Sequence, residues 1–294
     1  MNILATLNRN YLFHFLVMVD SLMYHHPHEK IDLYLISNDI SLEDIKCLQM
    51  FDNLSIHLMQ YHNQILAVAK TTYRYPPEIY TRLYAIEYLP NTVERILYLD
   101  PDIIVLKNLK SLYEMDFQDN YYIGATNVKG FLTRFNNWKN KAAKGSKYLN
   151  TGVLLINIEK LRKEQNIQEL NEYIIKNEKR LFLPDQDVLN ALYGNKVIVI
   201  DNLKYNLSDR AIKRYNLTNR KKINRHWVDE NAYIIHYYGK NKPWKDKYRG
   251  ILKPYYEFHA ERVKKIIEYL REKVGEIMKK NTILLFILLL MLFL

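Results

Sequence analysis

The segment at residues 95–106, RILYLDPDIIVL, constrains the fold more than any other part of the sequence. Residues 96–99 are all apolar, without the alternation of a strand that faces water on one side. A short run of this kind is typical of an inner strand of a parallel sheet, which is buried on both faces. The run ends at Asp100 and Asp102, and a chain does not bury two neighbouring carboxylates without a positive partner. The segment therefore predicts a buried sheet with a cationic group at the carboxyl end of this strand.

Strand and helix patterns alternate along the rest of the chain. Apolar or alternating runs predict strands at residues 1–7, 31–37, 54–60, 95–99, 121–127, 152–158, 196–200 and 232–238. Helical patterns cover residues 11–25, 76–89, 159–178 and 185–194, and Ser41 with Asp44 forms a capping pair ahead of a further helix. This alternation predicts an α/β fold with a mostly parallel central sheet and helices on both faces. Ligands of such sheets bind outside the carboxyl ends of the strands, and no Gly-rich nucleotide loop follows the first strand here.

Composition excludes some kinds of site and indicates a kind of partner. The single cysteine, Cys47, excludes an intramolecular disulfide and a cysteine-based zinc cluster. The first residues lack the basic region and cleavage site of a signal peptide. Residues 202–254 carry 14 lysines and arginines against 4 acidic residues, whereas residues 1–201 are nearly balanced. Such a segment is either a solubilising surface or a contact for phosphates, an acidic membrane or nucleic acid. No RNA-binding module is recognisable, so we expect no nucleic-acid partner.

The carboxylates of Asp100 and Asp102 point to the same side if the strand continues through them. Two acids on one side form a hard-oxygen site that suits Mg²⁺ or Mn²⁺. The competing structural interpretation is a strand-end aspartate that caps a turn at Pro101. A strand followed by Asp-x-Asp also opens the haloacid-dehalogenase phosphatases, but there the motif starts the fold, whereas three predicted strands precede it here.

A second informative segment is IIHYYGKNKPW at residues 234–244. His236 ends an apolar strand, and although a lone histidine is usually structural, this one precedes a glycine and two lysines. The imidazole would complete a metal site, Gly239 would let the backbone approach closely, and Lys240 or Lys242 would neutralise phosphate oxygens. Trp244 is either a packing residue or a platform for a sugar.

Six segments in order resemble glycosyltransferase family 8, the family of glycogenin and of bacterial lipopolysaccharide galactosyl- and glucosyltransferases. They are NILATLNRNY, YTRLYAIEYL, ILYLDPD, LNTGVLLINI, LPDQDVLNALY and HYYGKNKPW, and they span roughly residues 1–250. The resemblance implies a GT-A fold, the Rossmann-like fold of nucleotide-diphospho-sugar transferases. It also implies a retaining transfer of glucose or galactose from a UDP-sugar, with Mn²⁺, or Mg²⁺ in its place, at the diphosphate.

The resemblance assigns roles to individual residues by motif. The implied metal ligands are Asp100, Asp102 and His236. The implied donor-binding residues, which hold the uridine, the diphosphate or the sugar, are Asn8, Asn10, Tyr11, Arg82, Asn150, Thr151, Gly239 and Lys242. The implied catalytic residues at the hexose and its anomeric carbon are Asp185, Gln186 and Asp187.

Two positions depart from the pattern of better-known members, and both affect the donor. Asn8 stands where some members carry Asp, and an Asn amide still pairs with uracil, whose edge has both donor and acceptor atoms. Asn127 stands where the bacterial galactosyltransferase carries Asp near the sugar, which leaves the choice of hexose open.

Retention through a covalent intermediate needs a carboxylate behind the anomeric carbon. The best-matched residue there is Gln186, a poor nucleophile. We therefore expect front-face attack, with Gln186 stabilising the cationic sugar and Asp187 as the fallback nucleophile. Asp185 also suits a helix N-cap, and Arg82 could be a structural partner of a carboxylate.

The C-terminus differs in character from the rest of the chain. Residues 251–280 predict a basic amphipathic helix, and residues 281–294 an apolar tail that associates with a membrane. The last twelve residues reach about 18 Å as a helix, short of a hydrocarbon core of about 30 Å. They form a monotopic anchor, part of a span that starts earlier, or a segment packed into the protein. Lys279 and Lys280 favour the cytoplasmic face of the cell membrane, where the family's bacterial members use lipid-linked acceptors.

The sequence thus predicts a membrane-associated, Mn²⁺-dependent glycosyltransferase that elongates a cell-surface glycan or lipid-linked acceptor. A sugar nucleotidyltransferase would share the sheet, but it should carry a Gly-rich loop after the first strand, and ATLNRNY has no glycine. An inactive membrane-bound protein that binds a glycan or nucleotide is the non-enzymatic alternative.

Overall fold

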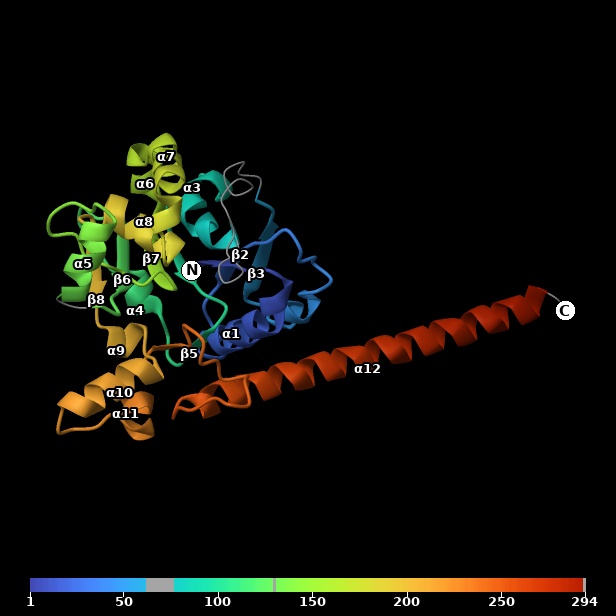
Figure 1. Cartoon of the computed structure of the whole chain (residues 1–294). Helices are drawn as coiled ribbons and strands as arrows, with labels where there is room; N and C mark the ends of the chain where they lie inside the picture. Colours follow the sequence, from blue (N-terminus) through green and yellow to red (C-terminus); the bar gives the residue numbers. More distant parts are fainter. Residues whose placement is uncertain (62–76, 129–130, 293–294) are drawn as a thin grey trace.

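A computed structural model describes residues 1–61, 77–128 and 131–292, with the side chains of the C-terminal helix described through Lys273. Its centre is a seven-stranded sheet of order β3-β2-β1-β4-β7-β6-β8 (Figure 1). The strands are β1 (Asn2–Thr6), β2 (Ile31–Ile36), β3 (Leu54–Met59), β4 (Arg95–Leu99), β6 (Tyr122–Ala125), β7 (Val153–Asn157) and β8 (Val197–Ile200). The predicted, mostly parallel sheet is confirmed, although β7 runs antiparallel to both of its neighbours, β4 and β6.

Alternate residues of the inner strands face two separate hydrophobic cores. Leu97 and Leu99 of β4 belong to the core that packs under α1 (Leu12–Tyr24), whereas Ile96 and Tyr98 face the opposite core. Side chains alternate across a strand, so a strand that is apolar at every position is covered on both faces. The second core is closed by α3 (Ala85–Tyr88), α6 (Ile158–Glu164), α7 (Ile167–Asn177) and α8 (Pro184–Tyr193).

Some predicted helices differ from the observed ones in type or length. The helix expected at 76–89 is described from Pro77 as a 3-10 helix, η3 (Pro77–Tyr84), followed by α3. The Ser41–Asp44 pair forms, with Ser41 Oγ donating to Asp44 at 2.6 Å, but only the short 3-10 helix η2 (Lys46–Met50) follows. The polar helix expected at 159–178 breaks into α6 and α7, because the Asn166 side chain accepts from Glu169 N and starts a new helix.

A small two-stranded sheet joins distant parts of the chain. Strand β5 (Ile103–Val105) pairs antiparallel with β9 (Ile234–His236), and Ile103 lies opposite His236. The Tyr237 amide then donates to the Asp102 carbonyl oxygen at 3.0 Å. This pairing places the end of β9 beside the turn that follows β4.

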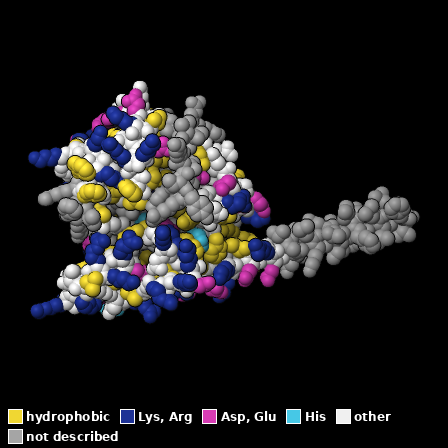
Figure 2. All heavy atoms as spheres, in the orientation of Figure 1, with side chains coloured by type: hydrophobic (Ala, Val, Ile, Leu, Met, Phe, Trp, Pro, Cys, Tyr) yellow, Lys and Arg dark blue, Asp and Glu magenta, His cyan; other side chains and the backbone are white. Residues whose placement is uncertain are grey.

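The described residues form seven further helices. They are η1 (Arg9–Tyr11), α4 (Lys110–Tyr113), α5 (Phe131–Lys139), η4 (Glu178–Arg180), α9 (Asn202–Tyr205), α10 (Asp209–Thr218) and α11 (Arg225–Asn231). Figure 2 shows that Lys and Arg side chains gather on the lower part of the molecule, where α9–α11 lie in Figure 1.

The C-terminal helix α12 (Lys253–Leu292) begins against α1 and then runs past the body of the protein (Figure 1). Asp20 of α1 is 1% exposed and pairs with His259 at 2.7 Å and with Arg262 at 2.9 Å. No helix within the described part of the chain combines the length and apolarity needed to cross a membrane. The side chains of the predicted apolar tail, residues 281–294, lie outside the described residues.

Candidate active site

Three of the predicted residues form one cluster at the carboxyl end of β4. Asp100 and Asp102 lie in the turn between β4 and β5, and His236 ends β9. One ligand atom from each lies within 4.8 Å of the others. His236 Nε2 is 3.2 Å from Asp102 Oδ1 and 3.5 Å from Asp100 Oδ2. The two carboxylates converge through a turn, where the sequence predicted an extended strand.

Basic side chains compensate the two carboxylates, of which Asp102 is buried and Asp100 is half-buried. Arg82 Nη1 is 3.0 Å from Asp100 Oδ1, and Lys242 Nζ contacts Asp102 Oδ2. Burial by itself would raise the pKa of Asp102, but Lys242 and His236 hold that pKa well below its usual range. The same balance, with Arg82 as the main counter-charge, lowers the pKa of Asp100. Both carboxylates are therefore charged at neutral pH and available as ligands.

The shape of the site suits a small cation. A Cβ atom added at Gly152 would lie 2.5 Å from Asp100 Oδ2 and 2.9 Å from His236 Nε2. Only a residue without a side chain lets the Asp100 and His236 side chains approach the backbone this closely. Carboxylate oxygens with an imidazole nitrogen are a donor set that suits Mn²⁺, and the oxygens also suit Mg²⁺. Asp100, Asp102 and His236 would hold the ion.

Arg82 connects this cluster to α8. Its guanidinium is 6% exposed, donates to the Thr151 carbonyl oxygen at 2.9 Å, and lies 3.3 Å from Asp185 Oδ2. Thr151 Oγ1 donates to the same Asp185 oxygen at 2.7 Å. Asp185 lies in the first turn of α8, and the N-cap is Leu183. Burial raises the pKa of Asp185, and Arg82 opposes that rise. Arg82 thus has carboxylate partners on both sides, as the structural interpretation of this arginine required.

Gln186 and Asp187 follow Asp185 but have different surroundings. Gln186 is 7% exposed, and its Oε1 accepts from Asn150 Nδ2 at 3.3 Å. Asp187 is 1% exposed and accepts five hydrogen bonds. The donors are Lys139 Nζ at 3.1 Å, Asn140 Nδ2 at 2.7 Å, Tyr148 OH at 2.6 Å, Phe182 N at 2.8 Å and Leu183 N at 3.2 Å. Both carboxylate oxygens of Asp187 thus accept hydrogen bonds. Through them Asp187, which lies in α8, connects this helix to α5 and to the loop before α8.

The residues expected at the uridine lie on the turn after β1. Asn8 Oδ1 accepts from Asn10 N at 3.2 Å and caps η1, while the Asn10 side chain is exposed. Tyr11 is half-buried, and its ring centroid is 6.2 Å from that of Trp244. Trp244 stacks on His14 with a centroid separation of 3.5 Å, which favours the packing interpretation of this tryptophan. Burial lowers the pKa of His14 to about 4, and the ring is neutral at pH 7.

The turn after β9 directs one of its two lysines into the site. Gly239 has a φ of +85°, a backbone conformation that disfavours residues with a side chain. Lys240 is exposed, whereas Lys242 is 8% exposed and lies 5.9 Å from the Tyr11 ring centroid. The Tyr237 carbonyl oxygen accepts from Lys242 Nζ at 2.9 Å. The turn therefore brings a buried ammonium group between the Asp100–Asp102–His236 cluster and the tyrosine.

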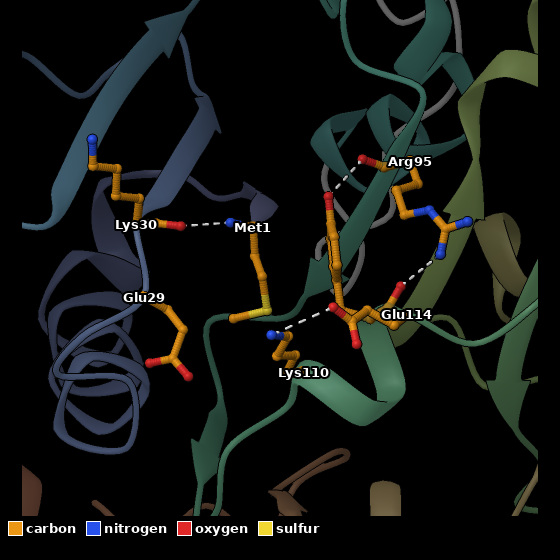
Figure 3. Close-up of a pocket in the computed structure, with 7 residues that line it drawn as sticks. Met1, Glu29, Lys30, Arg95, Lys110 and Glu114 are labelled. Atoms are coloured by element: carbon orange, nitrogen blue, oxygen red, sulfur yellow. Dashed lines mark hydrogen bonds and ion pairs between the residues drawn. The ribbon is translucent and has the colours of Figure 1, made fainter.

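An open pocket of about 600 Å³ lies at the amino ends of strands of the large sheet, on the side opposite the cluster (Figure 3). It is lined by Met1, Glu29, Lys30, Arg95, Lys110, Tyr113 and Glu114. Met1 and Arg95 lie at the amino ends of β1 and β4, opposite the carboxyl ends that carry the cluster. The pocket contains none of the predicted site residues.

Sequence reasoning missed three residues of the site. Tyr98 donates its hydroxyl to Asp100 Oδ1 at 2.8 Å, and its ring lies 4.2 Å under the Arg82 guanidinium carbon. Gly152 is part of the quoted LNTG segment, but its contact with Asp100 and His236 depends on β7 packing beside β4. Asn206 accepts from His236 Nδ1 at 2.7 Å, and no local pattern in its neighbourhood marks it.

Sequence comparison identifies relatives over most of the chain. A profile of "Glycosyl transferase family 8" matches residues 2–248. A lipopolysaccharide 1,2-glucosyltransferase of Escherichia coli is 25% identical over 254 residues, which cover 83% of this chain and 73% of the relative. A lipopolysaccharide 1,3-galactosyltransferase of Salmonella typhimurium is 28% identical over 269 residues, which cover 83% of this chain and 72% of that protein.

Solved structures share the fold. The galactosyltransferase LgtC, crystallised with donor and acceptor sugar analogues, superposes with a TM-score of 0.74 at 23% identity, covering 89% of this chain and 96% of LgtC. This similarity confirms the predicted GT-A fold. The profile match over nearly the whole chain shows that the protein is a glycosyltransferase and belongs to glycosyl transferase family 8.

Proposed function

We propose that the protein is a Mn²⁺-dependent, retaining hexosyltransferase that moves glucose or galactose from a UDP-sugar to a cell-surface glycan or lipid-linked acceptor. The observation that carries the proposal is the cluster of Asp100, Asp102 and His236, which packs so closely against Gly152 that no Cβ atom fits there. Mg²⁺ is an alternative cation for the same ligands. The names of the two relatives, a glucosyltransferase and a galactosyltransferase, support the choice of hexose.

Cleavage of a sugar–phosphate bond places negative charge on the leaving diphosphate. A divalent cation supplies Lewis-acid stabilisation of that charge when it is bound. The ammonium of Lys242 is buried beside the cluster and adds a second, fixed positive charge at low solvent exposure. Arg82 holds Asp100 and the Thr151 carbonyl in place.

The sugar itself becomes positively charged as the bond breaks. Gln186, whose side chain is positioned by Asn150, is the group we assign to the anomeric carbon. Asp187 has all of its acceptor capacity engaged by five donors, which supports front-face attack over a covalent intermediate on that residue. Gln186→Ala should lower kcat far more than it raises the donor KM, because the interaction forms mainly in the transition state.

We also propose that the enzyme works at the cytoplasmic face of the cell membrane. The basic residues 202–254, which include α9–α11, would face anionic lipid, and the apolar tail would insert into it. Ending the chain after Lys280 should move much of the protein to the soluble fraction. Donor hydrolysis and transfer to a water-soluble acceptor should survive, whereas transfer to a lipid-linked acceptor should fall.

The central test is incubation with a panel of UDP-sugars, Mn²⁺ and a lipid extract, with identification of the product and its anomeric configuration. Asp102→Asn should lose Mn²⁺ binding and donor hydrolysis together, since it removes a ligand charge. Full transfer by the metal-free Asp102→Asn protein would contradict the proposed metal. Binding of UDP-sugar without hydrolysis or transfer would instead indicate an inactive binding protein.

A further inference from the structure

We propose that Asn206 is a positioning residue that orients both the metal ligand His236 and the sugar-site amides through one chain of buried hydrogen bonds. This inference rests on the proposed function. Asn206 follows α9, is 1% exposed, and belongs to none of the segments that carry the family resemblance. Its neighbour Leu207 forms a β-bridge with Ile235 and accepts from the His236 amide at 2.8 Å. The Asn206 backbone is thereby attached directly to the strand that carries the metal ligand.

A backbone amide shows in which direction the hydrogen bonds of this series run. Gly152 N donates to Asn150 Oδ1 at 3.2 Å, and a backbone N–H can only donate. This contact identifies the oxygen of the Asn150 amide. Asn206 Nδ2 donates to the same oxygen at 3.2 Å, and it donates to Asn127 Oδ1 at 3.2 Å as well. The nitrogen end of Asn206 therefore faces two amide oxygens, and its own oxygen must point the other way.

That oxygen points at His236. Asn206 Oδ1 lies 2.7 Å from His236 Nδ1, and an amide oxygen can only accept, so Nδ1 carries a proton. The other ring nitrogen, Nε2, faces the carboxylates of Asp100 and Asp102. A histidine that binds a metal through Nε2 needs this arrangement, in which a second partner holds the Nδ1 proton and the ring orientation. Asn206 is that partner.

The same series of hydrogen bonds extends to the side chain of Gln186. The nitrogen of Asn150 donates to Gln186 Oε1 at 3.3 Å, so the orientation of Asn150 also sets that of Gln186. The path from His236 through Asn206 and Asn150 to Gln186 lies among side chains that are all less than 10% exposed. Water competes little for hydrogen bonds at such positions, and each amide therefore restricts the next.

Two substitutions separate the two functions of Asn206. Asn206→Asp keeps an oxygen for His236 Nδ1 but removes the N–H that reaches Asn150 and Asn127. Asn206→Ala removes both. We expect Asn206→Ala to weaken Mn²⁺ binding by about 10- to 100-fold, as removal of such outer partners does in other metal sites. Asn206→Asp should keep Mn²⁺ affinity close to wild type and lower kcat, with a smaller effect on the donor KM.

Mn²⁺ binding is measured on protein without donor, by the electron paramagnetic resonance signal of the free ion, and thermal unfolding is recorded for each variant. Asn177→Ala is the matched control. Asn177 is 8% exposed, and its amide donates to the Tyr173 carbonyl within α7. This control should lose some stability but keep Mn²⁺ affinity. If Asn206→Ala does not fold, Asn206→Leu replaces it, because a leucine side chain has nearly the shape of asparagine and no atom that can form a hydrogen bond.

The inference is wrong if a folded Asn206→Ala or Asn206→Leu protein binds Mn²⁺ as tightly as wild type. It is also wrong if Asn206→Asp loses Mn²⁺ affinity as fully as Asn206→Ala, because the retained oxygen would then have no effect. If the wild-type protein itself binds no Mn²⁺, the proposed metal and this inference both fail. Normal wild-type binding with unchanged variants overturns this inference alone.

Discussion

Gly152→Ala tests whether Asp100, Asp102 and His236 together form a metal site, because the added methyl group would displace two of these ligands. The added Cβ atom would lie 2.2 Å from His236 Cε1, which is 1.2 Å less than the 3.4 Å at which ordinary contact begins. It would also lie 2.5 Å from Asp100 Oδ2. The imidazole is 2% exposed and is held by Asn206 at 2.7 Å, so it cannot move aside without losing a hydrogen bond.

The size of the effect follows from this overlap. Overpacking of a close-packed interior typically costs about 1–3 kcal/mol of unfolding free energy. Metal sites tolerate changes of only about 0.2 Å in ligand distance, and here a ligand must move by several times that amount. We therefore expect a loss of Mn²⁺ affinity of at least about tenfold, with donor hydrolysis reduced in parallel, since a misplacement of about 1 Å can cost about a hundredfold in rate.

The assay is a Mn²⁺ titration followed by electron paramagnetic resonance, together with thermal unfolding of the same samples. Gly124→Ala is the control for overpacking, because its Cβ would lie 2.9 Å from Leu154 Cδ2, in the core rather than in the cluster. The control should lose stability and retain Mn²⁺ affinity. A folded Gly152→Ala protein with wild-type Mn²⁺ affinity would refute the assignment of Asp100, Asp102 and His236 as the cation site.

Three further predictions concern ionisable side chains in or beside the site. Arg82→Lys should lower the melting temperature and kcat, because a lysine cannot reproduce the planar contacts of a guanidinium between two carboxylates, and circular dichroism with kinetics would show this. Unchanged values would contradict that role. Asp187→Asn should destabilise the fold by about 1–3 kcal/mol, since one oxygen replaces two acceptors, and mass spectrometry of wild type should find no glycosyl ester on this residue. A trapped ester would restore the covalent mechanism. The pKa of His14 falls from 6.5 to about 4 on folding, so the unfolded chain binds more protons between these values and stability is lost as pH drops through this window. Without solvent screening, this change in the pKa of His14 would correspond to about 3 kcal/mol of unfolding free energy. Because the ring is partly exposed, screening by water reduces the expected contribution to about 1–2 kcal/mol. Urea unfolding of metal-free protein at pH 7 and pH 4 should show a smaller difference for His14→Gln, and an equal difference would contradict it.

Local patterns in the sequence were sufficient for the strands of the large sheet and for the need of the two carboxylates for a positive partner, but strand β5 was not predicted. The apolar run before Asp100 predicted an inner strand because burial on both faces requires apolar residues at every position. The charges of Asp100 and Asp102 predicted a cationic partner, which the structure supplies as Arg82, Lys242 and His236. These inferences depend only on neighbours along the chain and on the cost of burying charge.

Features that depend on residues far apart in the sequence could not be predicted from such patterns. The reversal of β7 is set by which strands it joins in the sheet, and its own sequence suits either direction. The interpretation of Asp187 as a fallback nucleophile rested on its position after Gln186. Its five donors come from the end of α5, from Asn140 just after it, from Tyr148 and from the loop before α8, and only the folded chain brings them together.

By itself, the sequence determined the α/β class, the order of the strands along the chain and the carboxylate pair, because each is a property of a short segment. The tertiary structure alone decided that Gly152 leaves room beside Asp100, and that Asn206 holds His236 from 30 residues away. The reason is physical: an amide or a glycine carries no charge or periodicity of its own. Its role arises only when packing removes water and presents a specific partner at hydrogen-bonding distance.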